Sequence, residues 1–169
     1  MQTLKAMADA GTPYTGVLYA GMMLTAAGPN LIEYNCRFGD PEAQALLLRL
    51  ESDLVDILLA CAEGRLAEVT PRWSAETAVT IVFAAMGYPA TPITGTVIEG
   101  IDAAEALGVT VFHAGTRHNA AGRLVAAGGR VLGIAALGAD LGEARSLAYA
   151  AIRKIRWHGG FYRRDIGKA

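Results

Sequence analysis

The stretch EYNCRFGDPEAQ, residues 33–44, constrains the fold of this chain more than any other. Glu33, Asn35 and Arg37 alternate with residues suited to a core, and successive side chains of a β-strand point to opposite faces of a sheet. The three polar side chains therefore share one face, spaced about 6.6 Å apart along it. We predict a strand over residues 31–38, and we expect its core side to carry Ile32, Tyr34, Cys36 and Phe38.

The polar face of this strand has the composition of a metal–phosphate site. A carboxylate beside an amide oxygen suits Mg²⁺, which takes one or two protein oxygens while water and substrate phosphates fill its other positions. Arg37 is placed to contact a phosphate with two N–H groups. The alternative interpretation is an ordinary exposed strand face, which each of these residues taken singly would also fit.

A helix is predicted directly after the strand. Asp40 is a good N-cap, and Pro41 suits the first helical position because the N–H that proline lacks would have no partner there. The free N–H groups of such a helix start favour a bound anion near the polar face.

The rest of the sequence predicts an α+β fold. We expect a short helix at residues 2–10, an antiparallel hairpin of residues 15–25 with 31–38, and a helix that ends at Gly64. Further strands are expected at 78–86, 94–100 and 109–115, followed by a hairpin over 123–138 that turns at Gly128–Gly129. The last helix is predicted from Asp140, capped with the help of Glu143, to about residue 156.

Composition excludes several classes of function. The chain has 169 residues, is 53% hydrophobic and carries a formal net charge of -1, so bulk electrostatics do not favour nucleic acid or an anionic membrane. Cys36 and Cys61 give neither a disulfide framework nor a zinc spacing, and we expect a reducing, cytoplasmic location. His113, between apolar residues, is expected to be a core histidine rather than a catalytic one.

Several motifs occur in the order found in one enzyme family. The stretch YTGVLYAGMMLTAAGPNLIEYNCRFGDPEAQ resembles the late part of the ATP-grasp domain of the phosphoribosylamine–glycine ligases (glycinamide ribonucleotide synthetases), with RFGDPE as its most distinctive piece. Downstream, GYP, VFHAGT, GGRVLGIAALG and FYRRDIG resemble the C-terminal domain of that family. The resemblance implies the C-terminal half of an ATP-grasp antiparallel sheet with helices over residues 1–73. A small β-rich C-terminal domain with a terminal helix would follow over residues 74–169.

The resemblance also implies an activity and a set of site residues. The activity is ATP-dependent ligation of glycine to 5-phosphoribosylamine, giving glycinamide ribonucleotide, ADP and phosphate, a step of purine biosynthesis. The metal-binding acid and amide of the family map onto Glu33 and Asn35, with ATP and Mg²⁺ or Mn²⁺ as cofactors. Arg37 and Asp40 lie in the family signature, and we expect them to contact phosphate or substrate as the catalytic pair.

The family enzymes are much longer than this chain, and the sequence contains neither GxxxxGK[ST] nor GxGxxG. We therefore expect a fragment or one half of a split enzyme, inactive alone and requiring the N-terminal part in cis or in trans. Two alternatives stay open. One is another ATP-grasp carboxylate–amine ligase, and the other is a non-catalytic interaction or regulatory module that retains the fold.

Overall fold

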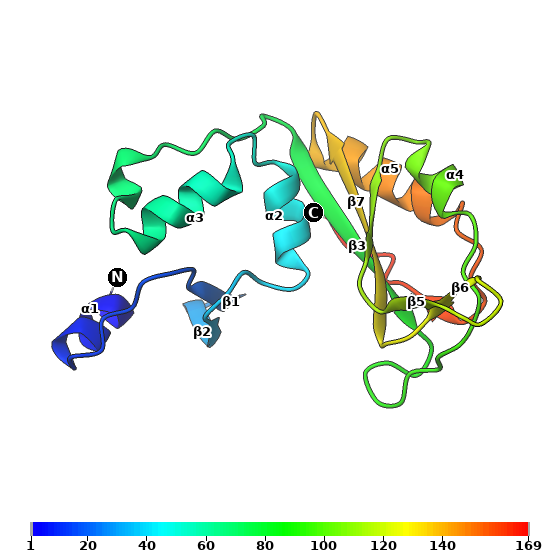
Figure 1. Ribbon diagram of the computed structural model, residues 1–169, viewed down its shortest axis with the longest axis horizontal. Coiled ribbons are helices and arrows are strands. Elements are labelled where there is room, and N and C mark those ends of the chain that lie inside the picture. The colour runs from blue at the N-terminus through cyan, green and yellow to red at the C-terminus, as the bar shows by residue number, and fades with distance from the viewer. Residues whose placement is uncertain (1, 169) are drawn as a thin grey trace. The chain divides into compact units, whose positions relative to one another are not determined.

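The computed structural model describes residues 2–168 as two compact units, which are described separately here (Figure 1). The first unit contains the residues up to Gly39 together with Leu50–Trp73. The second contains Asp40–Arg49 and the chain from Ser74 onward. Helices and antiparallel sheets occur in the chain, so the predicted α+β class is confirmed.

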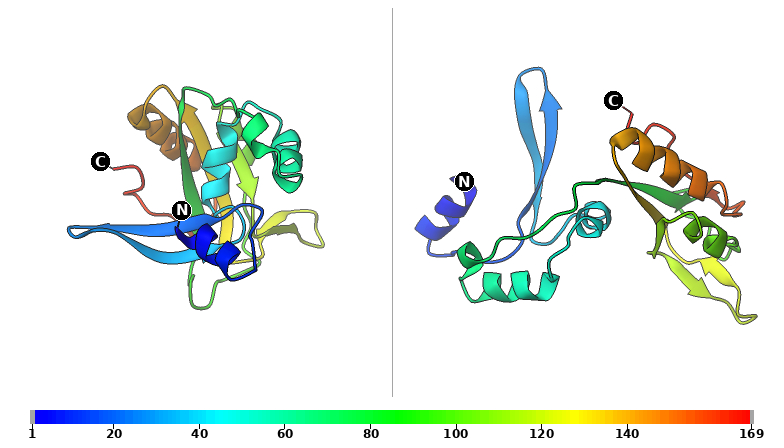
Figure 2. Two further views of the ribbon diagram at one scale, coloured as in Figure 1. Left: turned by 90° about the vertical axis from the view of Figure 1, so that its left-hand side faces the viewer. Right: turned by 90° about the horizontal axis from the view of Figure 1, so that it is seen from above.

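The first unit combines helices with a two-stranded hairpin. Helix α1 (Gln2–Asp9) is followed by β1 (Tyr19–Thr25) and β2 (Gly28–Asn35), which pair antiparallel from Tyr19↔Asn35 to Thr25↔Gly28 (Figure 2). Helix α3 (Leu54–Ala62) begins at Asp53, whose carboxylate accepts a hydrogen bond from the N–H of Val55, and a 3₁₀ turn spans Leu66–Glu68. The predicted hairpin and first helix are therefore confirmed, although β2 ends three residues earlier than expected.

The prediction that one face of β2 packs into a core is wrong. Ile32 is 63% exposed, Tyr34 is 42% exposed and Cys36 is also exposed. Tyr34 instead hydrogen-bonds through its hydroxyl to Thr3 Oγ1 in α1, at 2.6 Å. A two-stranded hairpin buries little apolar surface by itself, so alternation marks two faces without deciding that either is covered.

The second unit is built on a sheet with the order β4 (Thr110–His113), β7 (Arg130–Gly138), β3 (Thr77–Ala85) and β8 (Gly160–Phe161). Helix α5 (Leu141–Ile152) packs on β3 and β7, and fully buried side chains form the core between them. Helix α2 (Glu42–Leu48) meets the other face, where Gly133 leaves room for the side chain of Gln44. The short helix α4 (Ile101–Glu105) lies beside α5 and β4.

The predicted hairpin over residues 123–138 is wrong in its pairing. Strand β6 (Leu124–Ala126) pairs with β5 (Thr116–His118), whereas β7 pairs with β4 and β3. The turn that connects β5 to β6 lies at residues 119–122. There, Asn119 Oδ1 accepts hydrogen bonds from the N–H groups of Ala121 and Arg123. Gly128 marks a close backbone approach, since a Cβ on Gly115 would lie 3.0 Å from the Gly128 Cα. Gly128–Gly129 therefore lies at a bend between β6 and β7, and not at the turn of the hairpin.

The other predicted boundaries are partly confirmed. Strand β3 lies where it was predicted, but residues 94–100 form only isolated bridges, Val97↔Val125 and Glu99↔Arg156. Helix α5 begins as predicted, with Asp140 Oδ1 accepting from the N–H of Glu143 at 2.8 Å. It ends at Ile152, four residues before the predicted end, because the chain turns there to form the next bridge.

Candidate functional site

Glu33 and Asn35 lie side by side near the end of β2, on one face of the strand. The Asn35 amide nitrogen donates to Glu33 Oε1 at 2.9 Å, which orients the amide and leaves its Oδ1 free to accept. The pair therefore offers the second carboxylate oxygen of Glu33 and the amide oxygen of Asn35. These are the ligands that a hard cation such as Mg²⁺ prefers.

The donor set fits a cation that keeps most of its shell for water and substrate. Within residues 2–168, no group of three or more His, Cys, Asp or Glu side chains is arranged to hold a metal. This chain would give a cation at β2 the two oxygens of Glu33 and Asn35, which leaves positions for water and phosphate oxygens, as is usual for Mg²⁺ in nucleotide sites.

Arg37 lies beyond the end of β2, so it does not continue the strand face as predicted. Its Nη1 donates to the carbonyl of Phe38 at 2.8 Å, and the residue is exposed. This single bond leaves most of the five guanidinium N–H groups available, which suits a contact to phosphate. Its role as a phosphate ligand remains a prediction.

Asp40 does not cap helix α2, contrary to the prediction. Pro41 takes the cap position without a side-chain hydrogen bond, and the carboxylate of Asp40 binds Arg130. Arg130 donates through Nη2 to Asp40 Oδ2 and through Nη1 to the Asp40 carbonyl, both at 2.7 Å. The guanidinium carries a full positive charge whereas a helix N–H does not, so the carboxylate gains an ion pair by turning toward Arg130.

The four predicted site residues are divided between the two units. Glu33, Asn35 and Arg37 belong to the first, and only Glu33 and Asn35 contact each other; Asp40 belongs to the second. The sequence assigned no role to Arg130, the partner of Asp40, because GGRVLG was interpreted as a turn, a strand and part of a family motif.

The first unit also holds Tyr14 close to Cys36. Desolvation raises the pKa of Tyr14, and a hydrogen bond with the Cys36 thiol raises it further. The Tyr14 hydroxyl donates to the carbonyl of Val17 at 2.8 Å. Cys36 is exposed and Tyr14 is half-buried, so Cys36 is not the core thiol that strand alternation predicted.

His113 is exposed, so the prediction of a core histidine is wrong. Its Nδ1 lies 3.0 Å from Thr116 Oγ1, and both residues line an open hollow of about 630 Å³ together with Arg117 and His118. A bend follows His113, where the N–H groups of Ala114 and Gly115 both donate to the carbonyl of Val131. No role for His113 follows from these contacts.

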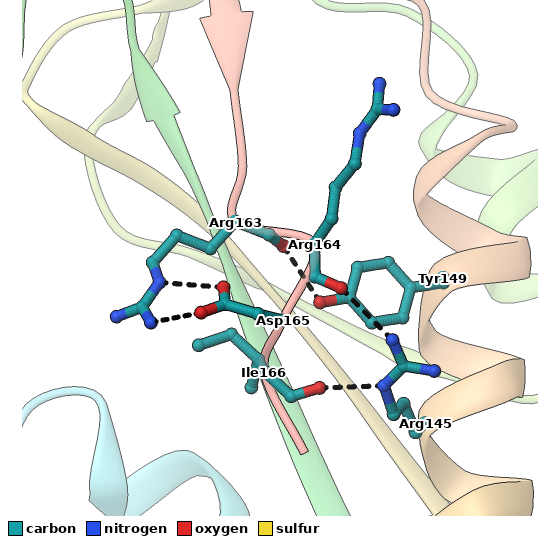
Figure 3. Close-up of polar contacts among 6 residues, drawn as sticks. All are labelled: Arg145, Tyr149, Arg163, Arg164, Asp165 and Ile166. Atoms are coloured by element: carbon teal, nitrogen blue, oxygen red, sulfur yellow. Dashed lines mark hydrogen bonds and ion pairs between the residues drawn. The ribbon is translucent and has the colours of Figure 1, made fainter. Parts of the chain in front are cut away.

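Side chains of α5 donate hydrogen bonds to backbone carbonyls of residues 162–166, which we call the C-terminal segment (Figure 3). Arg145 donates to the carbonyls of Ile166 and Arg164, and the Tyr149 hydroxyl donates to the carbonyl of Arg163 at 2.8 Å. Arg163 in turn makes two hydrogen bonds to Asp165, which lower the pKa of Asp165 and raise that of Arg163.

Two family models match the chain. The model described as "Phosphoribosylglycinamide synthetase, ATP-grasp (A) domain" matches residues 1–43, and the one described as "Phosphoribosylglycinamide synthetase, C domain" matches residues 78–169. The end of an ATP-grasp domain followed by a C domain defines the class of protein as an ATP-grasp ligase. The chain belongs to the phosphoribosylglycinamide synthetase family.

Similar proteins agree with this assignment. A phosphoribosylamine–glycine ligase from Caulobacter vibrioides is 58% identical over 166 residues, which cover 98% of this chain and 39% of that protein. The chloroplastic ligase of Arabidopsis thaliana is 50% identical, with 98% of this chain and 32% of that protein covered. The crystal structure of the Thermotoga maritima ligase matches with a TM-score of 0.79 at 37% identity, over 98% of this chain and 40% of that one. The chain thus spans about 39% of the length of the Caulobacter relative.

None of the helices formed by residues 2–168 combines the length and the apolar character needed to cross a bilayer.

Proposed function

We propose that this chain supplies the metal-binding edge and the C domain of an enzyme that ligates glycine to 5-phosphoribosylamine, using ATP and Mg²⁺ or Mn²⁺. The products are glycinamide ribonucleotide, ADP and phosphate. The observation that carries the proposal is the hydrogen-bonded Glu33–Asn35 pair. It occurs in a chain that is 58% identical to the phosphoribosylamine–glycine ligase of Caulobacter vibrioides.

In the proposed reaction, the carboxylate of glycine attacks the γ-phosphorus of ATP, and ADP leaves. The amine of phosphoribosylamine then attacks the carbonyl carbon of glycyl phosphate, loses a proton, and displaces phosphate. A bound metal supplies charge stabilisation to the transferring phosphoryl group. Glu33 and Asn35 would hold that metal, and the exposed guanidinium of Arg37 would bind phosphate oxygens.

The remaining groups of this active site are proposed to come from the N-terminal part of the enzyme, in cis or in trans. We propose residues 1–73 as the end of the ATP-grasp domain and residues 74–169 as the C domain. Asp40 is better assigned to positioning than to direct catalysis, because its carboxylate is already paired with Arg130. The proposed location is the cytoplasm, where the free thiols of Cys36 and Cys61 would stay reduced.

A chimera tests the proposal directly. The segment of the Caulobacter ligase that aligns with this chain is replaced by this chain, and incorporation of labelled glycine into glycinamide ribonucleotide is measured. We expect product formation that requires ATP, Mg²⁺ and phosphoribosylamine, whereas this chain alone forms none. A folded chimera without product would favour a non-catalytic module, and product from this chain alone would contradict the need for a second part.

A further inference from the structure

A basic hollow lies between α5 and the C-terminal segment, within the second unit. Its volume is about 450 Å³, and its lining consists of Arg145, Ser146, Tyr149, Arg153, Tyr162 and Arg164. Half of these residues are arginines and none is acidic. A hollow of this size suits a small ligand, and its charge favours an anion.

Arg145 is the fixed element of the hollow. Its Nε donates to the carbonyl of Ile166 at 2.9 Å, and its Nη2 donates to the carbonyl of Arg164 at 3.1 Å. The guanidinium carbon also lies 4.9 Å from the centre of the Tyr149 ring. These two bonds use two of the five N–H groups of an arginine, so three remain for a ligand in a group that is already oriented.

Arg153 and Arg164 add two further positive charges to the lining of the hollow. Both are exposed, and no side-chain hydrogen bond or ion pair of either one occurs among residues 2–168. The carboxylate of Asp165 is engaged by Arg163 through two hydrogen bonds. Figure 3 shows the Arg164 side chain directed away from this ion pair.

We propose that this hollow binds the phosphate group of a small phosphorylated metabolite. Arg153 and Arg164 contact the phosphate oxygens, and the free N–H groups of Arg145 and the hydroxyl of Ser146 complete the donor set. The tyrosine rings form an aromatic wall against which a sugar packs. A ligand held in this way bridges α5 and the C-terminal segment. None of its lining residues is Glu33, Asn35, Arg37 or Asp40, which are the residues considered above for the proposed ligase site.

The test is a titration of the 169-residue chain, at constant ionic strength, with orthophosphate and separately with ribose 5-phosphate. Chemical shifts of the backbone and of arginine Nε groups report on binding. We expect saturable shifts at residues 145–153 and 162–166, with a one-to-one stoichiometry. Tighter binding of ribose 5-phosphate would identify the ligand as a phosphorylated sugar, and equal affinity would identify it as free phosphate; both support a phosphate site.

The variant R153A/R164A should weaken binding at least tenfold, and R153K/R164K should weaken it less because it keeps the charge but loses the planar fork. The matched control is R117A/R123A, which removes two exposed arginines from the β5–β6 hairpin. Shifts that do not saturate, or an equal loss of affinity in the control, would overturn the proposal. So would preferential binding of single-stranded DNA that the control abolishes. None of these readouts depends on ligase activity.

Discussion

Arg130 binds Asp40 twice, once at the backbone carbonyl and once at the carboxylate, across 90 residues of sequence. The contact ties the segment that leads into α2 to the first residue of β7. It thereby joins two motifs that the sequence shows only as separate stretches, GDPE and GGRVLG.

Removal of this guanidinium should destabilise the second unit modestly. The side chains of Arg130 and Asp40 are 37% and 59% exposed, so we expect R130A to lower the free energy of unfolding by about 1 kcal/mol. D40N should lower it less, because the bond to the carbonyl remains. Urea unfolding measures both, with K5A as a control for a largely exposed ion pair. Equal losses in R130A and K5A would show that the double contact adds nothing.

The pKa of Asp165 should depend on Arg163. Hydrogen bonds from Arg163 hold this pKa below its ordinary value in the folded state, so the pair stabilises the fold above the unfolded pKa. That stability is lost as the pH falls through the lower, folded pKa. A ¹³C titration of the carboxyl should show the pKa rising in R163A and unchanged in R164A, whose side chain does not pair with Asp165. An unshifted pKa in R163A would contradict the assignment.

The start of α5 depends on the side chain of Asp140. Its Oδ1 accepts from the N–H of Glu143, and Glu143 Oε2 accepts from the N–H of Ala139 at 2.7 Å. We expect D140A to lower the free energy of unfolding by about 1 kcal/mol, since it leaves the N–H of Glu143 without a partner. D140N keeps an accepting oxygen and should be nearly neutral. Thermal unfolding distinguishes them, and an equal loss in both variants would assign the effect to charge instead.

Gly138 allows the end of β7 to pass closely by α5. A Cβ there would clash with the backbone nitrogen of Ala144, whereas a Cβ at Gly142 would meet only the Asp140 carboxylate, at 3.2 Å. Backbone cannot move aside as a side chain can, so G138A should cost about 2 kcal/mol and G142A much less. Denaturant unfolding of the two variants tests this difference, and similar losses would show that the helix shifts freely.

The sequence predicted the elements whose signals are local. Strand β3, α3 with its end near Gly64 and the start of α5 all follow from residues within a few positions of one another. The sequence-based prediction was wrong where a residue distant in sequence determines the local conformation. The carboxylate of Asp40 left its cap position for Arg130, and Gly128 serves a backbone crossing with Gly115 rather than a turn.

The candidate site shows the same division. Alternation alone brought Glu33 and Asn35 together, and the structure gives them a direct hydrogen bond. The same alternation could not tell whether Ile32 would be covered, because burial depends on what packs against the hairpin and not on the strand itself.

The proposed metal-binding role of Glu33 and Asn35 is tested most directly by turnover of the chimera described above. E33A and N35A should each lower kcat for glycine-dependent ADP release on the order of 100-fold, with the free energy of unfolding unchanged. N30A, an amide on the same hairpin that contacts Thr25 instead, should keep normal turnover. Near-normal turnover in both E33A and N35A would contradict the account and leave the polar face of β2 as an ordinary exposed strand.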